Sequence, residues 1–92
     1  MLFDMKLSHQ RFFPEGWLIA PSGKWLILFH HDPMSLARCP QFYTDKWYAT
    51  PNRTPLGFKN RRKAPLEESV ETWNELIGNG WLRVNHQCGD VS

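Results

Sequence analysis

Two short runs of β-branched, leucine and aromatic residues flank the sequence Pro-Ser-Gly. In the first stretch Trp17 and Ile19 share one face of an extended chain. In the second, three large apolar residues share a face and two leucines occupy the other, so both faces are apolar. A period of two indicates β-strands, and Pro21 and Gly23 are typical of a turn between them. The pattern predicts a hairpin over residues 15–31 whose second strand is buried on both sides.

Two further strands are predicted downstream. Residues 31–40 lie between prolines and predict a loop, and residues 41–50 predict a third strand, unless Asp45 and Lys46 form a tight turn. The next stretch alternates, with Leu56, Phe58, Asn60 and Arg62 on one face and Gly57, Lys59, Arg61 and Lys63 on the other. This alternation predicts an edge strand whose charges discourage edge-to-edge aggregation.

A helical period begins after the fourth predicted strand. The apolar positions are Leu66, Val70, Trp73 and Ile77, with Leu76 widening the stripe. This spacing is that of one helix face. Pro65 fits the first helical position, the macrodipole favours Glu67 and Glu68 in the first turn, and Gly78 is expected near the C-terminal end.

The short sequence Trp-Leu-Arg-Val after the helix predicts a last strand, which gives the order β-β-β-β-α-β. That order predicts an α+β fold. In it, a small antiparallel sheet of about four to five strands is covered by one helix from the C-terminal half of the chain.

The chain has 92 residues, enough for a single domain. We expect residues 1–92 to divide into an N-terminal arm (1–13), a core (14–84) and a tail (85–92). Five Trp and six Phe supply the apolar surface that so short a chain needs for a core.

Location and redox state follow from what the sequence contains. Residues 1–10 include Asp4 and have no apolar run typical of a signal peptide. The longest strictly apolar run, residues 25–29, is far too short to span a bilayer. Two cysteines do not suggest a disulfide framework. These features predict a soluble cytoplasmic protein.

Charge is distributed unevenly although the net charge is only +2. Residues 52–63 carry five basic residues and no acid, whereas residues 64–92 carry one basic residue and five acids. The uneven distribution of charge is therefore more informative about possible binding partners than the net charge.

Residues 16–84 resemble a family of small cyanobacterial proteins that carry a domain of unknown function. The matching motifs are GWLIAPSGKWLILFHHDP, a strand with a single KW, KNRRKAPLEES and WNELIGNGW. The resemblance implies a cyanobacterial or cyanophage source and no particular activity.

The basic strand predicts a non-enzymatic nucleic-acid-binding protein. The candidate phosphate contacts are Arg53, Lys59, Arg61, Arg62 and Lys63. Trp47 and Tyr43 are candidate stacking platforms, with Trp47 expected to be exposed. About four contacts to a single strand would give a log–log salt slope near −3. The opposing interpretation is a solvated edge that the glutamates of the helix neutralise.

A protein–protein adaptor or regulator is the alternative function. Its basic strand and acidic helix would face a partner protein or a second copy in a homodimer. An adaptor should expose a contiguous apolar patch and bind at moderate salt, whereas nucleic-acid binding should weaken steeply with salt.

Metal sites, cofactors and catalysis are not predicted. The candidate ligands are His30, His31, Cys39, His86 and Cys88, and their spacing matches no standard zinc site. The sequence has no nucleophile elbow, P-loop, dinucleotide fingerprint or zinc-protease motif. The glutamates at helical spacing indicate a solvated face.

Overall fold

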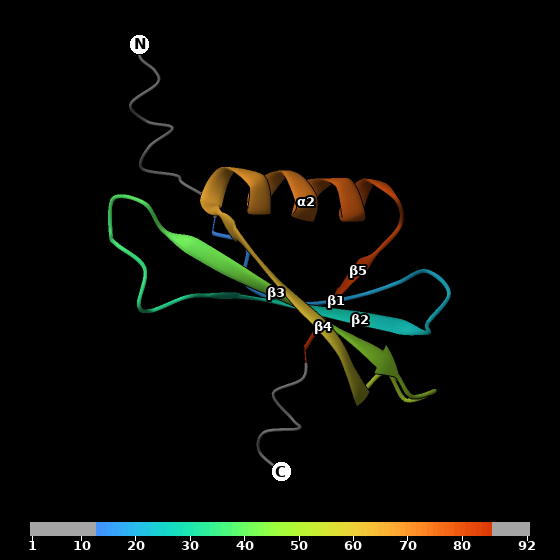
Figure 1. Ribbon diagram of the computed structural model, residues 1–92. Helices are drawn as coiled ribbons and strands as arrows, with labels where there is room; N and C mark the ends of the chain where they lie inside the picture. The colour runs from blue at the N-terminus through green and yellow to red at the C-terminus, as the bar shows by residue number, and fades with distance from the viewer. Residues whose placement is uncertain (1–12, 86–92) are drawn as a thin grey trace.

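A five-stranded antiparallel sheet and one helix form the two layers of the protein (Figure 1). The structure is a computed structural model in which residues 13–85 are described. The elements are β1 (Gly16–Ile19), β2 (Trp25–His31), β3 (Gln41–Ala49), β4 (Pro55–Pro65), α2 (Leu66–Gly78) and β5 (Leu82–Val84). The predicted α+β fold and the order β-β-β-β-α-β are confirmed. The predicted arm, except Phe13, and the tail beyond Asn85 lie outside the described residues.

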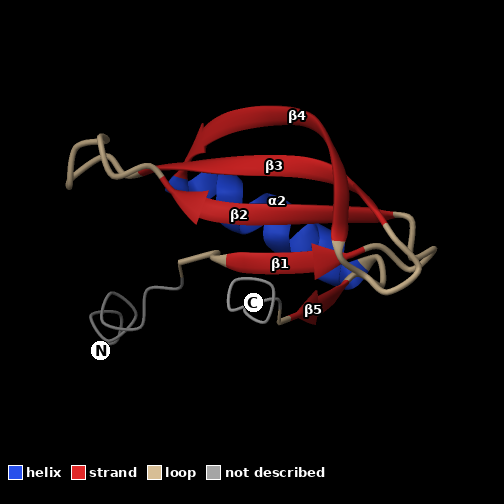
Figure 2. Ribbon diagram, turned by 90° about the horizontal axis from the view of Figure 1, so that it is seen from below, coloured by secondary structure: helices blue, strands red, loops and turns tan. Residues whose placement is uncertain are grey.

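The strands lie in the order β4-β3-β2-β1-β5, and every neighbouring pair is antiparallel. The first four strands form consecutive hairpins, and α2 then carries the chain back across one face of the sheet to β5 on the far side of β1. Figure 2 shows the helix behind the strands when the sheet is viewed from its other face. The prediction that residues 56–64 form an edge strand is confirmed.

The first hairpin forms as its sequence predicts. The amide of Ala20 donates to the carbonyl of Trp25 (3.0 Å), and the amide of Gly23 donates to the carbonyl of Ala20 (2.8 Å). Gly23 has φ of 78°, a left-handed conformation that glycine adopts without the steric cost of a Cβ. The third strand is continuous through Asp45 and Lys46, so these residues form no turn.

Both helix ends differ by one or two residues from the prediction. Pro65 is extended (φ −69°, ψ 167°) and caps the helix, which begins at Leu66. Pro65 still pairs with Gln41 in the sheet, and this pairing holds it in the strand. At the other end Gly78 remains helical, and Gly80 takes the left-handed conformation with φ of 97°.

The core lies between α2 and the sheet. Leu18, Phe29 and Trp73 form its buried cluster, in which the rings of Phe29 and Trp73 meet edge to face at 5.0 Å. Ile27, Leu76 and Trp81 are partly buried against them. The buried helix stripe includes Ser69, Trp73 and Leu76, whereas Ile77 is 43 % exposed, so its predicted place in the stripe is wrong. Ser69 is 1 % exposed and its hydroxyl donates to the carbonyl of Ala64 (3.4 Å), so the helix face against the sheet includes Ser69.

A β-bulge in β4 changes which side chains share a face. Lys46 pairs with Asn60, but the next residue, Trp47, pairs with Phe58, so Lys59 is left without an opposite residue. The extra residue places Phe58 on the same face as Arg61, whereas strict alternation predicted the opposite face. Figure 2 shows β4 curving strongly along its length, as a bulge promotes.

Candidate binding surfaces beside strand β4

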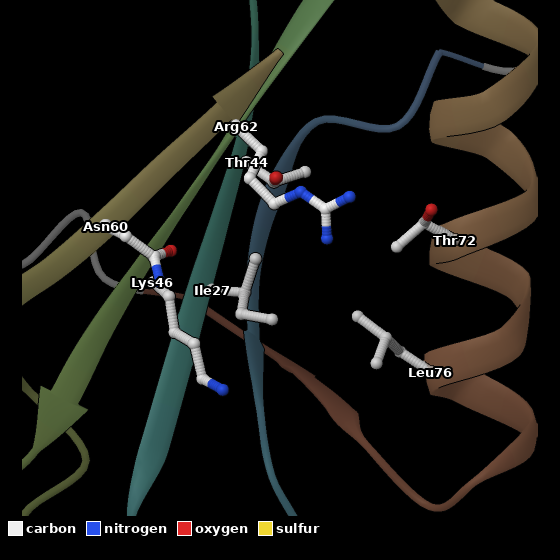
Figure 3. Close-up of a pocket in the computed structure, with 7 residues that line it drawn as sticks. All are labelled: Ile27, Thr44, Lys46, Asn60, Arg62, Thr72 and Leu76. Carbon is white, nitrogen blue, oxygen red and sulfur yellow. The ribbon is translucent and has the colours of Figure 1, made fainter. Parts of the chain in front are cut away.

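Strand β4 places its basic residues on two faces of the sheet. We call the face under α2 the helix face and the opposite one the outer face. Arg62 lines a cleft with residues of α2 and therefore lies on the helix face (Figure 3). Arg61 and Lys63 pair in register with Asp45 and Tyr43 and point to the outer face. The five predicted phosphate contacts therefore do not form one surface.

A buried carboxylate organises the outer face. Asp45 is 4 % exposed and accepts two hydrogen bonds from Arg61, from Nε to Oδ1 (2.7 Å) and from Nη2 to Oδ2 (2.9 Å). Nε2 of His30 lies 2.9 Å from Oδ2 of the same carboxylate. The Arg61 guanidinium also lies 4.4 Å from the ring centroid of Tyr43. This geometry fixes Arg61 by a paired fork of hydrogen bonds and by its contact with an aromatic ring.

The hydrogen bonds keep Asp45 ionised despite its position. Burial by itself would raise the pKa of Asp45, but the hydrogen bonds from Arg61 and His30 outweigh burial and lower the pKa below the ordinary value. The bond to Asp45 in turn raises the pKa of Arg61. Arg61 therefore remains charged, with most of its charge balanced by Asp45.

Lys63 is engaged in a second ion pair on the same face. Its Nζ lies 3.1 Å from Oδ2 of Asp32, which is buried in the loop after β2. The amide of Met34 donates to Oδ1 of Asp32 (2.9 Å). This bond has the largest effect on the pKa of Asp32, and together with the bond from Lys63 it lowers that pKa. The same pair raises the pKa of Lys63.

The remaining predicted cations have no such partner. Within residues 13–85, Arg53, Lys59 and Arg62 take part in no ion pair. Arg53 lies in the turn between β3 and β4, where its φ is 66°, and all three are exposed. These three residues, which we call the unpaired cations, are the part of the predicted site that remains available to an anionic ligand.

The glutamates of α2 are exposed and do not neutralise the basic strand directly. The four glutamates are Glu67, Glu68, Glu71 and Glu75. In the part of the chain that the structure describes, none lies within 4.0 Å of a basic nitrogen of β4. The partners of β4 are instead Asp45 and Asp32, which neither the charge count nor the motifs pointed out.

The aromatic residues beside β4 are arranged differently from the prediction. Trp47 is half-buried, and its indole N–H is buried without an acceptor among the described residues. Its ring contacts Phe58 edge to face at 5.3 Å. Phe58 is 52 % exposed and pairs with Trp47 from the neighbouring strand, on the same face, so Phe58 is the more accessible ring. Tyr43 is half-buried beneath Arg61.

The helix face has a cleft of about 270 Å³ between α2 and the edge of the sheet. Its lining consists of Ile27, Thr44, Lys46, Asn60, Arg62, Thr72 and Leu76. Figure 3 shows the Arg62 side chain extending from β4 toward α2, with Lys46 and Asn60 on the same side of the sheet. Lys46 was not predicted as a site residue, because its place in the cleft depends on the register that aligns it with Asn60.

The remaining predictions concern metal sites and membranes. Among residues 13–85 no group of three His, Cys, Asp or Glu residues could hold a metal ion. Cys39 is an exposed free thiol, and His86 and Cys88 lie outside the described residues. No helix within the described range is long and apolar enough to cross a membrane.

Comparison with known proteins identifies the family. A family of proteins of unknown function, DUF1651, matches residues 15–88, and the chain belongs to it. No curated protein and no solved structure matches the chain. The cyanobacterial source that the resemblance implied stays a prediction.

Proposed function

We propose that this member of the DUF1651 family is a non-enzymatic protein that binds single-stranded nucleic acid along β4. The observation that supports the proposal is the set of unpaired cations, Arg53, Lys59 and Arg62, on and just before an exposed edge strand. Exposed cations without intramolecular partners release counterions when phosphates replace those ions, which is the main source of sequence-independent affinity.

An aromatic ring beside Lys59, on the face opposite Arg62, supports a single strand over a duplex. Phe58 is adjacent in sequence to Lys59 and exposes about half of its surface (52 %). Bases of a single strand stack on such rings, at about 1–3 kcal/mol per base, whereas duplex bases are already stacked. Trp47, packed against Phe58, would hold the platform in place.

Arg61 and Lys63 have a different role in this proposal. Their bonds to Asp45 and Asp32 connect β4 to β3 and to the loop after β2, so their main role is to hold the surface in place. Reversing their charge would place a carboxylate next to Asp45 and next to Asp32, and the repulsion would change folding and binding together. The unpaired cations are therefore the better residues to mutate.

Fluorescence anisotropy with labelled single-stranded and duplex DNA and RNA tests the proposal. We expect single strands to bind more tightly, with a log–log salt slope near −2 from about three phosphate contacts at roughly 0.7 each. The variant Lys59→Glu/Arg62→Glu should lose this binding, and Phe58→Ala should weaken it about 5- to 160-fold. Arg38→Glu, which changes an exposed arginine of the loop between β2 and β3, is the matched control and should bind normally. Absence of binding to all four nucleic acids at low salt would refute the proposal.

A protein partner is the second candidate function, and exposed apolar residues favour it. Leu56 is 69 % exposed on β4, two residues before Phe58, and Tyr48 is 44 % exposed on the helix face of β3. The open edge of β4 could also pair with a second copy, although its charged side chains oppose this. Sedimentation of the wild type and of Leu56→Ser at moderate salt tests self-association. A dimer that Leu56→Ser dissociates would favour this candidate. A cytoplasmic location, which either function would suit, stays a prediction.

A further inference from the structure

The cleft between α2 and the β3–β4 edge combines two cations with neutral hydrogen-bonding groups. Arg62 and Lys46 supply the charge, and Asn60 and Thr44 supply an amide and a hydroxyl. Because Thr44 pairs with Arg62 and Lys46 pairs with Asn60 across adjacent strands, all four side chains rise from one small area of the sheet. The lining includes no carboxylate.

The two cations are held near each other without a counter-charge. Arg62 and Lys46 are diagonal neighbours across the strand pair, a relation that places Cβ atoms about 7–8 Å apart or somewhat less. Neither takes part in an ion pair within residues 13–85. The Lys46 ammonium lies 4.4 Å from the ring centroid of Trp25, a cation–π contact that limits the movement of the side chain. An anion between them would relieve their mutual repulsion.

From this geometry we propose that the cleft binds a phosphate group. The planar fork of an arginine matches phosphate oxygens with two parallel N–H bonds, and a lysine adds a point charge. Two cations balance the charge of about −1.5 to −2 that a phosphomonoester carries at pH 7. Asn60 and Thr44 can donate to the remaining oxygens. The Thr72 hydroxyl already donates to the carbonyl of Glu68 (3.0 Å) and is not counted among these donors.

The size and the apolar part of the lining restrict the ligand. The volume of about 270 Å³ is slightly below the range of roughly 300–1,000 Å³ typical of drug-sized ligands. Ile27 and Leu76 line the cleft beside the polar groups and can contact the apolar part of a small ester. The phosphate could belong to a free phosphomonoester or to the 5′ end of a nucleic-acid strand. This proposal shares Arg62 with the proposed function but does not depend on it.

The competing arrangement is an ion pair with the helix. Glu68 and Glu75 lie one turn before and after Thr72 on α2, and a change of rotamer could bring either one toward Arg62 or Lys46. If such pairs filled the cleft in solution, removing the glutamates would expose the cations. The variant Glu68→Gln/Glu75→Gln should therefore bind phosphate at least as tightly as the wild type.

Two-dimensional NMR titration at low salt tests the site, with inorganic phosphate and a nucleoside 5′-monophosphate as separate probes. We expect both probes to shift the amide signals of β3, β4 and α2 around the cleft. Arg62→Gln/Lys46→Gln should weaken binding at least tenfold, and Arg38→Gln should leave the affinity unchanged. Unaltered thermal unfolding of each variant would show that folding is intact. Absence of shifts at 10 mM of either probe, or shifts that persist in the double variant, would overturn the proposal.

Oligonucleotides with and without a 5′-phosphate separate the two sources of the phosphate. Tighter binding of the phosphorylated strand, lost in Arg62→Gln/Lys46→Gln, would identify a strand end. Equal binding of the two oligonucleotides, together with monophosphate binding, would identify a free ester. Lys59→Glu lies outside the cleft lining, so a loss of oligonucleotide affinity with unchanged monophosphate binding would separate the cleft from the proposed surface along β4.

Discussion

Replacing Asp45 with asparagine should destabilise the fold by disrupting the hydrogen bonds that join Asp45 to Arg61 and His30 on the outer face. The substitution keeps the size of the side chain but removes the charge that Arg61 and His30 share. It also replaces one acceptor oxygen with an NH₂ donor, which must then face the donors of Arg61 or His30. Asp45 is only 4 % exposed, so water cannot reach the new amide group to accept its hydrogen bonds.

The magnitude follows from the three contacts of the carboxylate. Hydrogen bonds to charged groups contribute about 1.5–3 kcal/mol each when the groups are buried. Because the Arg61 side chain is 49 % exposed and all three bonds share one acceptor group, their contributions cannot be added in full. We therefore expect a loss of about 2 kcal/mol, which corresponds to roughly 8–16 °C in Tm for a domain of this size.

Urea unfolding followed by tryptophan fluorescence and circular dichroism measures this loss. Glu71→Gln makes the same change from carboxylate to amide on the exposed face of α2 and should stay within about 0.5 kcal/mol of the wild type. If Asp45→Asn unfolds at the same urea concentration as this control, the ion pair contributes nothing to stability. The claim that Arg61 is a structural residue would then be refuted.

Acid unfolding provides an independent check through linkage. The folded-state pKa values of Asp45 and Asp32 are lowered, so both groups contribute stability that is present above their unfolded pKa of about 4. That stability is lost as the pH falls through the lowered folded values. Wild-type protein should lose stability steeply below about pH 4, and Asp45→Asn should lose less over the same interval because one of the two groups no longer titrates.

Three further predictions concern the scaffold and the unpaired cations. Phe29→Ala should cost about 3–5 kcal/mol in urea unfolding, because it removes a fully buried ring from its edge-to-face contact with Trp73. Gly80→Ala should lower Tm more than Gly23→Ala, since both glycines have positive φ but a Cβ at Gly80 would also lie 3.2 Å from Cγ of Pro21. Lys59→Glu should leave urea unfolding within about 0.5 kcal/mol of the wild type, because Lys59 is exposed and outside every described ion pair.

The strands and the helix were predictable because their signals are local. Two β-prone apolar runs around Pro21 and Gly23 identified the first hairpin, and the spacing of Val70 and Trp73 after Pro65 identified the helix. The exact orientation of the helix was not predictable in the same way. Ser69 faces the sheet and Ile77 partly faces solvent because packing against the sheet, and not hydropathy alone, decides the rotation.

The candidate site was less predictable because it depends on contacts between distant residues. Arg61 and Asp45 are 16 residues apart and meet only when β3 and β4 pair in one register. The bulge at Lys59 changes the face of Phe58, and a bulge is a property of two paired strands and cannot be read from one. An acidic residue in the middle of a β-prone stretch was the one available signal, since buried aspartates are usually paired.

The measured salt slope can therefore report on the ion pairs as well as on binding. If phosphates contact only the unpaired cations, the slope should be near −2 and the affinity should change little with pH. A slope near −3 would mean that phosphates also displace a carboxylate from Arg61 or Lys63. If Arg61 left Asp45, the carboxylate would keep His30 as its partner but would lie beside a phosphate, where protonation is favoured, so binding would then tighten as the pH falls. A steep slope without tighter binding at low pH would require cations other than those of β4.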